Sequence, residues 1–139
     1  LGVSVSTSYK LGDTVITGIT PGTGASSVLA NISAGSGTVK VLKADGTENT
    51  GAVGTGNKIA VYANGTLVKQ YDVVIYGDIN GDGKISVVDL VIMQKQILGT
   101  SQLSGAYAAA ADISRDGKVS IKDLVLLQKH IINAAQIEQ

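Results

Sequence analysis

Two stretches of this chain, 34 residues apart, share one pattern of aspartates and glycines. The first is "GDINGDGKISVVDL" at residues 77–90, and the second is "ADISRDGKVSIKDL" at residues 111–124. When residues 78–98 are aligned with residues 112–132, 12 of 21 positions are identical. The similarity continues past the loops into apolar segments with the period of a helix, so the sequence indicates an internal repeat of one loop-and-helix unit.

Each loop concentrates carboxylates in a way that calls for a cation. Six of the eleven acidic residues of the chain lie in these two loops, and close carboxylates repel one another unless a cation pairs with them. The chain has no cysteine, which excludes a thiolate site. Oxygen donors of this number suit calcium better than zinc or copper, and magnesium takes fewer protein ligands.

The spacing of these donors matches an EF-hand calcium loop. Such a loop takes ligands from positions 1, 3, 5, 7, 9 and 12 and turns at a glycine in position 6, here Gly83 and Gly117. Position 12 is an aspartate in both loops, where a glutamate is usual. The sequence therefore predicts two calcium ions, one per loop. The predicted ligands are Asp78, Asn80, Asp82, the carbonyl of Lys84, a water near Ser86 and Asp89 in the first loop, and Asp112, Ser114, Asp116, the carbonyl of Lys118, Ser120 and Asp123 in the second.

The first 76 residues have a different pattern. Short alternating apolar runs are separated by turn signals such as Asn64-Gly65 and Asp45-Gly46, which is typical of strands and hairpins. Residues 21–32 instead carry apolar side chains at helical spacing after a Pro-Gly pair. We therefore expect an α+β chain with a small, mostly β module over residues 1–76, arranged as ββαβββ or as an immunoglobulin-like sandwich, and an all-α domain over residues 77–139.

The loop-then-helix unit, present twice with aspartate at position 12, resembles the dockerin family of calcium-dependent docking modules of cellulosomes. The resemblance covers residues 77–133, and the first 76 residues are similar to the X modules that precede some dockerins. It implies a secreted protein that binds a cohesin domain of a scaffoldin or cell-surface protein, and so anchors its parent protein in an extracellular complex.

Helical-wheel positions separate two faces on each expected helix, residues 86–98 and 120–132. One face should pack the two helices together through Leu90, Met93, Ile97, Leu124, Leu127 and Ile131. A second apolar stripe is more than a small domain needs, so we expect it to meet a partner; the alternative is that Val87 and Ile121 are buried. The candidate partner-binding residues are Val87, Val88, Val91, Gln94, Lys95, Leu98, Ile121, Lys122, Val125, Gln128, Lys129 and Ile132. Among these, the dockerin resemblance assigns cohesin specificity to Val87, Val88, Gln94, Lys95, Ile121, Lys122, Gln128 and Lys129.

Other functions have weaker support in the sequence. Eleven basic residues balance eleven acidic ones, which favours neither nucleic acid nor an anionic membrane as a partner, and no apolar run is long enough for membrane insertion. The single histidine, His130, has no acidic residue within a turn on its helical face, so we expect a solvated residue and no enzyme activity. The rival hypotheses are a carbohydrate-binding or structural accessory module with calcium-stabilised repeats, for which five tyrosines offer little aromatic surface, and a calcium buffer or sensor.

Overall fold

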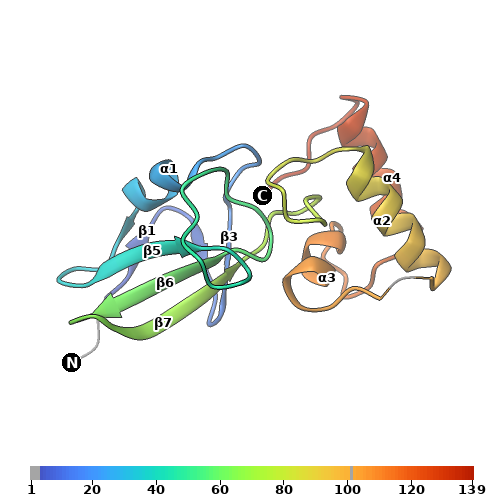
Figure 1. The fold of residues 1–139 in the computed structure, drawn as a ribbon. Helices are drawn as coiled ribbons and strands as arrows, with labels where there is room; N and C mark the ends of the chain where they lie inside the picture. Colours follow the sequence, from blue (N-terminus) through green and yellow to red (C-terminus); the bar gives the residue numbers. More distant parts are fainter. Residues whose placement is uncertain (1–3, 101) are drawn as a thin grey trace.

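The computed structural model describes residues 4–100 and 102–139, and it divides them between a β part and a helical part that lie side by side (Figure 1). The β part contains seven strands and one helix. Their bounds are β1 Ser6–Thr7, β2 Lys10–Leu11, β3 Val15–Thr17, α1 Ala25–Ala30, β4 Ile32–Ser33, β5 Thr38–Leu42, β6 Lys58–Ala63 and β7 Thr66–Val73.

Five of the strands form one sheet in the order β2-β3-β7-β6-β5, and β1 pairs with β4 in a separate two-stranded sheet. All neighbours are antiparallel except β3 and β7, which run parallel with Val15 opposite Asp72 and Ile16 opposite Val73. The expected mostly β module with one helix is confirmed. It has two strands more than ββαβββ, because two further two-residue strands form, β1 ahead of β2 and β4 directly after α1, and these pair only with each other.

The Asn64-Gly65 turn forms as its sequence predicts. Asn64 has φ 53° and Gly65 has φ 80°, and the flanking residues Ala63 and Thr66 are paired across β6 and β7. Two consecutive left-handed residues give the turn whose twist matches that of the strands it joins. From this turn the chain runs along β7 toward the first acidic loop.

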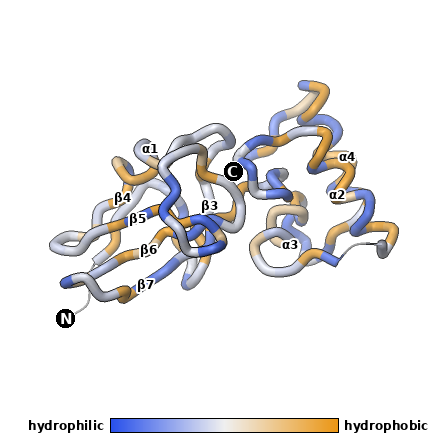
Figure 2. Tube along the Cα trace, viewed as in Figure 1, coloured by the Kyte–Doolittle hydropathy of each residue, from blue (hydrophilic) through white to orange (hydrophobic). Residues whose placement is uncertain are grey.

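The core of the β part lies between the five-stranded sheet and α1. Alternate residues of the central strands point into it, because successive strand side chains point to opposite faces. Its fully buried members include Ile16 from β3, Val28 from α1, Val41 from β5, and Ile59 and Val61 from β6. Figure 2 shows hydrophobic segments along these elements.

The helical part contains α2 Val87–Leu98, α3 Gly105–Ala111 and α4 Ile121–Ile131. Helix α2 is capped by Gly99, whose left-handed φ of 80° suits a glycine. The Thr100 amide donates to the Lys95 carbonyl at 3.0 Å. The apolar periodicity of the sequence predicts α2 and α4 but not α3. The missed signal is the run of alanines at residues 108–111, since alanine has the highest helix propensity.

A second core packs the helices against one another. Met93 of α2 and Leu127 of α4 are fully buried in it, and the other residues predicted for this face surround them, partly buried. Ile79 of the first loop and Ile113 of the second close the core at the loop end, which ties both loops to the helices. Among the described residues no helix is both long and apolar enough to cross a membrane.

Candidate functional site

The first acidic loop begins where the sheet ends. The chain leaves β7 at Val73, passes through the buried Val74 and Ile75, and enters the loop at Asp78. Both carboxylate oxygens of Asp78 accept backbone hydrogen bonds from the loop: Oδ1 from Gly81 and Asp82 at 3.1 and 3.2 Å, and Oδ2 from Gly83 at 3.0 Å. The loop is thus wound around its own first carboxylate.

Asp89 closes the same loop from the first turn of α2. Its Oδ1 accepts from the amides of Ile79 and Asn80 at 2.8 and 3.0 Å, and its Oδ2 accepts from Ser86 at 2.9 Å. A carboxylate in the first turn of a helix also interacts favourably with the unpaired amides there. One side chain therefore starts α2 and joins the two ends of the loop.

Three carboxylates of the first loop converge. Oxygen atoms of Asp78, Asp82 and Asp89 lie within 4.8 Å of one another, and Asp78 and Asp89 are fully buried. Burial raises the pKa of Asp78 to about 6 and also raises the pKa of Asp89, because a charged carboxylate is disfavoured away from water. A divalent cation would relieve both the desolvation and the mutual repulsion.

The second loop repeats this arrangement in a more open setting. Oxygens of Asp112, Asp116 and Asp123 lie within 4.8 Å of one another, with Asp123 buried and Asp116 exposed. The Lys118 amide donates to Asp116 at 3.1 Å and lowers the pKa of that carboxyl. Asp123 accepts from Ser114 and Ser120, as Asp89 does from Asn80 and Ser86 in the first loop.

Ser114 supplies a test of whether the second loop fits a cation. Its hydroxyl oxygen is buried and has no hydrogen-bond partner among the described residues. Buried polar atoms are normally paired, so an unpaired oxygen at the third loop position is explained if a cation takes it as a ligand. Both aspartate triads could hold a cation, and their all-oxygen donors fit a hard one.

The remaining predicted ligands lie in the loops between these aspartates. The Asn80 carbonyl oxygen Oδ1 accepts from the Asp82 amide at 3.2 Å, and the amides of Lys84 and Lys118 donate to Asp82 and Asp116. One group near the first site was not predicted. The Thr55 amide of the β part donates to Asp78 Oδ2 at 2.9 Å, and a backbone group 23 residues away leaves no local signal in the sequence.

The second apolar stripe of α2 and α4 is exposed, as expected for a partner-binding face. All twelve candidate partner-binding residues are exposed, including Val87 at 58% and Ile121 at 65%, so the alternative that these two are buried is wrong. Leu98 at the end of α2 and Ile121 at the start of α4 line one hollow together with Gln94, which places the two helices antiparallel. The exposed apolar stripes of the two repeats therefore meet at this hollow.

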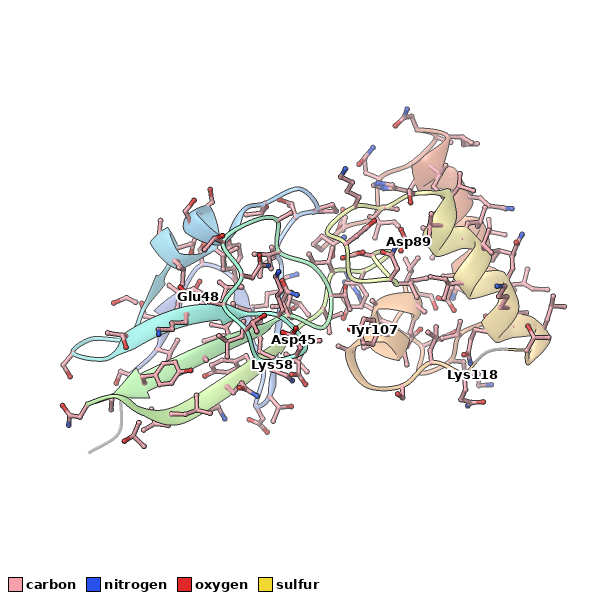
Figure 3. The ribbon with its side chains drawn as sticks, in the orientation of Figure 1. Asp45, Glu48, Lys58, Asp89, Tyr107 and Lys118 are labelled. Atoms are coloured by element: carbon pink, nitrogen blue, oxygen red, sulfur yellow. The ribbon has the colours of Figure 1, made fainter. Side chains whose placement is uncertain are left out.

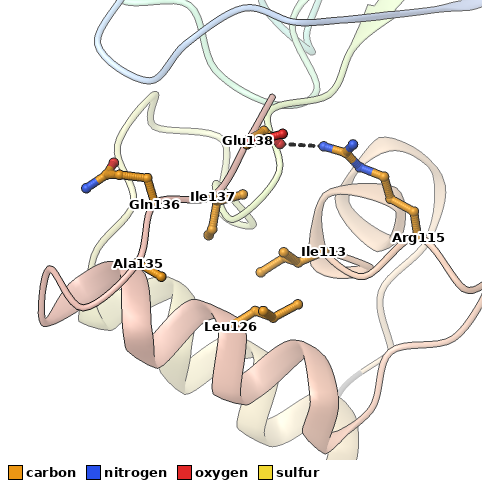
Figure 4. A pocket seen from close by; sticks show the side chains of 7 residues that line it. All are labelled: Ile113, Arg115, Leu126, Ala135, Gln136, Ile137 and Glu138. Atoms are coloured by element: carbon orange, nitrogen blue, oxygen red, sulfur yellow. Dashed lines mark hydrogen bonds between the residues drawn. The ribbon is translucent and has the colours of Figure 1, made fainter.

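His130 differs from its expected solvated state. It is half-buried, and its Nδ1 accepts from the Ile137 amide at 3.1 Å, so it fixes the C-terminal segment 133–139 against α4. The pocket beside this segment is lined by Ile113, Leu126 and tail residues, with Arg115 donating to the Glu138 carbonyl (Figure 4). The nearby histidine holds structure here and faces no cluster of acids or nucleophiles among the described residues.

The tyrosines form no exposed aromatic platform in the described part of the chain. Tyr71 is buried and the other four are partly covered. The Tyr76 ring lies under Arg115 at 4.0 Å, and Tyr107 packs against Gly56 on the side of α3 that faces the β part (Figure 3). Carbohydrate stacking therefore has no evident surface on these rings.

Comparison with known proteins gives one family and a set of solved structures. Residues 76–132 match the family model described as dockerin type I domain. No curated protein matches the chain. Two solved structures contain the third cohesin ScaC in complex with the ScaB dockerin from Acetivibrio cellulolyticus, mutated in the N-terminal helix in one and in the C-terminal helix in the other. They match at 27% and 26% identity, cover 47% of this chain and 92% and 96% of those chains, and have TM-scores of 0.44 and 0.43.

Proposed function

We propose that this chain, whose residues 76–132 match the dockerin type I family model, is a dockerin that binds a cohesin domain through the exposed face of α2 and α4. The partner would be a cohesin of a scaffoldin or cell-surface protein, as the dockerin resemblance implies. Binding would anchor the parent protein in a secreted, cellulosome-like complex outside the cell. We assign docking rather than catalysis to these residues.

The observation that carries the proposal is the exposed apolar stripe. Val87, Val91 and Leu98 of α2 continue into Ile121, Val125 and Ile132 of α4, although other apolar residues of both helices already fill the core. A contiguous exposed apolar face rimmed by polar side chains marks a site of protein contact. Gln94, Lys95, Gln128 and Lys129 supply that rim.

We further propose that the cofactor is calcium, with one ion per loop, held by the ligands that the spacing predicts. Bound calcium would neutralise the carboxylates. Asp89 and Asp123 then link each loop to the first turn of its helix, since each lies in that turn and accepts amides of its loop. Metal-binding free energy would thereby become folding free energy for the exposed apolar stripe of α2 and α4, which we call the docking face.

The division into modules supports the same proposal. One hydrophobic cluster lies within residues 5–75 and another within residues 79–137. We place the boundary between an X-like β module, residues 1–76, and the dockerin domain, residues 77–139. The docking face would then belong wholly to the second module.

The test is a set of binding titrations with a panel of purified cohesin domains. One variant carries Val87→Asp with Val88→Asp, another carries Ile121→Asp with Lys122→Asp, and a third combines all four. The matched control is Leu67→Asp, which charges an exposed leucine of β7 instead. We expect the combined variant to lose at least about 2 kcal/mol of binding free energy, as interface hot spots do, and the control to bind like the parent chain.

Two results would contradict the proposal. The first is a parent chain that binds no cohesin in the panel. The second is a combined variant that binds as tightly as the parent, which would remove the α2 and α4 face from the interface.

A further inference from the structure

The loop of residues 49–57, between β5 and β6, lies directly against the first acidic loop. Its Thr55 amide donates to Asp78 Oδ2 at 2.9 Å. A Cβ atom built on Gly54 would lie 2.1 Å from the Gly81 carbonyl oxygen and 2.8 Å from the Gly83 nitrogen, so the two backbones meet with no room for a side chain. On the other flank, the Gly22 amide donates to the Gly83 carbonyl at 2.8 Å. The β module therefore forms one wall of the first loop.

This wall is held rigidly from inside the β module. The buried Thr55 hydroxyl bonds the Ile75 backbone on both sides, accepting from its amide at 3.0 Å and donating to its carbonyl at 3.2 Å. Asn57 Oδ1 accepts from the Gly54 amide at 3.1 Å and from Asn49 at 2.8 Å. Two buried asparagines and one threonine thus fix the amide that points at Asp78.

The second loop has no such wall. Asp112 occupies the place of Asp78, and its oxygens accept only from Asp116 and Gly117 of its own loop among the described residues. A Cβ atom built on Gly117 would meet nothing within 4 Å, whereas one on the matching Gly83 would lie 2.9 Å from the Val53 carbonyl oxygen. The two loops differ in their surroundings far more than in their sequences.

We infer that the β module raises the calcium affinity of the first loop. Thr55 acts as a positioning residue that makes this site the tighter of the two. The inference rests on the calcium binding proposed above. Groups that orient a metal ligand without touching the metal typically change its affinity about 10- to 100-fold. The Thr55 amide is such a group, because it holds the Asp78 oxygen before any ion arrives.

Linkage makes the effect reciprocal. If the wall strengthens calcium binding at the first loop, calcium at that loop strengthens the contact with the wall by the same factor. Calcium would then secure the junction between the two modules as well as the docking face. The second ion would have no such effect on the β module.

The experiment measures calcium affinity by calorimetry in two backgrounds of the full chain. Asp112→Asn with Asp116→Asn leaves only the first site, and Asp78→Asn with Asp82→Asn leaves only the second. Into each we introduce Gly54→Ala, which forces the wall away, and the control Gly51→Ala, whose added Cβ makes an ordinary contact at 3.7 Å in the same loop. We expect Gly54→Ala to weaken the first site at least about tenfold and the second less than about twofold, and Gly51→Ala to change neither.

A second pair of variants keeps the test decisive if Gly54→Ala does not fold. Thr55→Val removes the hydroxyl that fixes the wall while keeping the size of the side chain, and Thr55→Ser restores the hydroxyl. We expect Val to weaken the first site alone and Ser to recover its affinity. In the unaltered chain, the Thr55 amide should exchange its hydrogen more slowly when calcium is added.

The outcomes separate this inference from the proposed function. The proposed calcium sites are contradicted if neither of the two single-site backgrounds binds calcium. Calcium binding that is equal in strength at both sites, or that is unchanged by Gly54→Ala and Thr55→Val in folded protein, overturns the role of the β module alone. That role is also overturned if calcium leaves hydrogen exchange at the Thr55 amide unchanged.

Discussion

The two acidic loops have nearly the same donors, but one is enclosed by a neighbouring module and the other faces solvent. Asp78 is fully buried, whereas Asp112, at the same position of the repeat, is half-buried. The difference arises because the β strand β7 leads into the first loop and carries the β module with it, while the short helix α3 leads into the second. A duplicated sequence thus gives two loops with different surroundings, and we expect their calcium affinities to differ for that reason.

Removal of calcium should produce the largest effect. Each ion, if bound as proposed, would add about 4 kcal/mol of stability at a free concentration about 1,000 times its dissociation constant. With excess chelator we expect the helical signal in circular dichroism to fall, and we expect amide exchange in the metal-free chain to be slower in α2 than in α4, because the loop before α2 keeps its wall. An unchanged helical signal would show that these helices fold without metal.

Loss of the last aspartate of each loop should come next. Asp89 accepts three backbone amides and Asp123 accepts two. Each buried amide left unpaired costs about 1 to 3 kcal/mol, so Asp89→Ala should destabilise the chain more than Asp123→Ala. Urea unfolding in chelator measures both without the contribution of calcium. Equal losses would mean that the third amide accepted by Asp89 adds nothing to stability.

The glycine at the sixth position of each loop allows a more closely matched comparison of the two loops. Gly83 and Gly117 have φ 83° and 89°, so replacing either with alanine incurs the same backbone strain of about 1 to 2 kcal/mol. Only Gly83→Ala also drives a Cβ against the Val53 carbonyl, which should add about 1 to 3 kcal/mol. Thermal unfolding of the two variants gives the difference. If Gly117→Ala lowers the unfolding temperature as much as Gly83→Ala does, the loop of residues 49–57 moves easily enough to accommodate the added Cβ.

The smallest effect concerns the docking face, where the repeats differ at Val88 and Lys122. A rotation of about half a turn exchanges the two helices, so a cohesin could bind in two orientations, and this position should decide between them. We expect Lys122→Val to raise affinity by no more than about twofold, because it makes the two orientations nearly equal. Crosslinking from one helix to the bound cohesin reports which orientation is present. If the parent chain and the Lys122→Val variant both bind in a single orientation, residues other than Val88 and Lys122 determine the orientation.

The repeat itself explains why much of this molecule was predictable. Loop spacing, both long helices and the exposed stripe follow from local patterns, since each depends on residues within a few turns of one another. The helix α3 has a local signal too, in its alanines, but no amphipathic period. The support of Asp78 by Thr55 and of the tail by His130 has no such signal, because both depend on how distant segments pack. Gly54 looks like an ordinary turn glycine until the Gly81 carbonyl is seen against it.

The parallel pairing of β3 with β7 bears on how the module would carry a mechanical load. A pull that enters upstream of β3 and leaves through β7 toward the first loop draws the two strands past each other along their length. Their hydrogen bonds, which include Asp72 to Thr14 at 2.7 Å and Val74 to Ile16 at 3.1 Å, are then strained together instead of opening one after another. Strands loaded in this way resist force better than a hairpin peeled from its end. If the face of α2 and α4 is held while the chain upstream of β3 is pulled, β3 and β7 would therefore be loaded in shear.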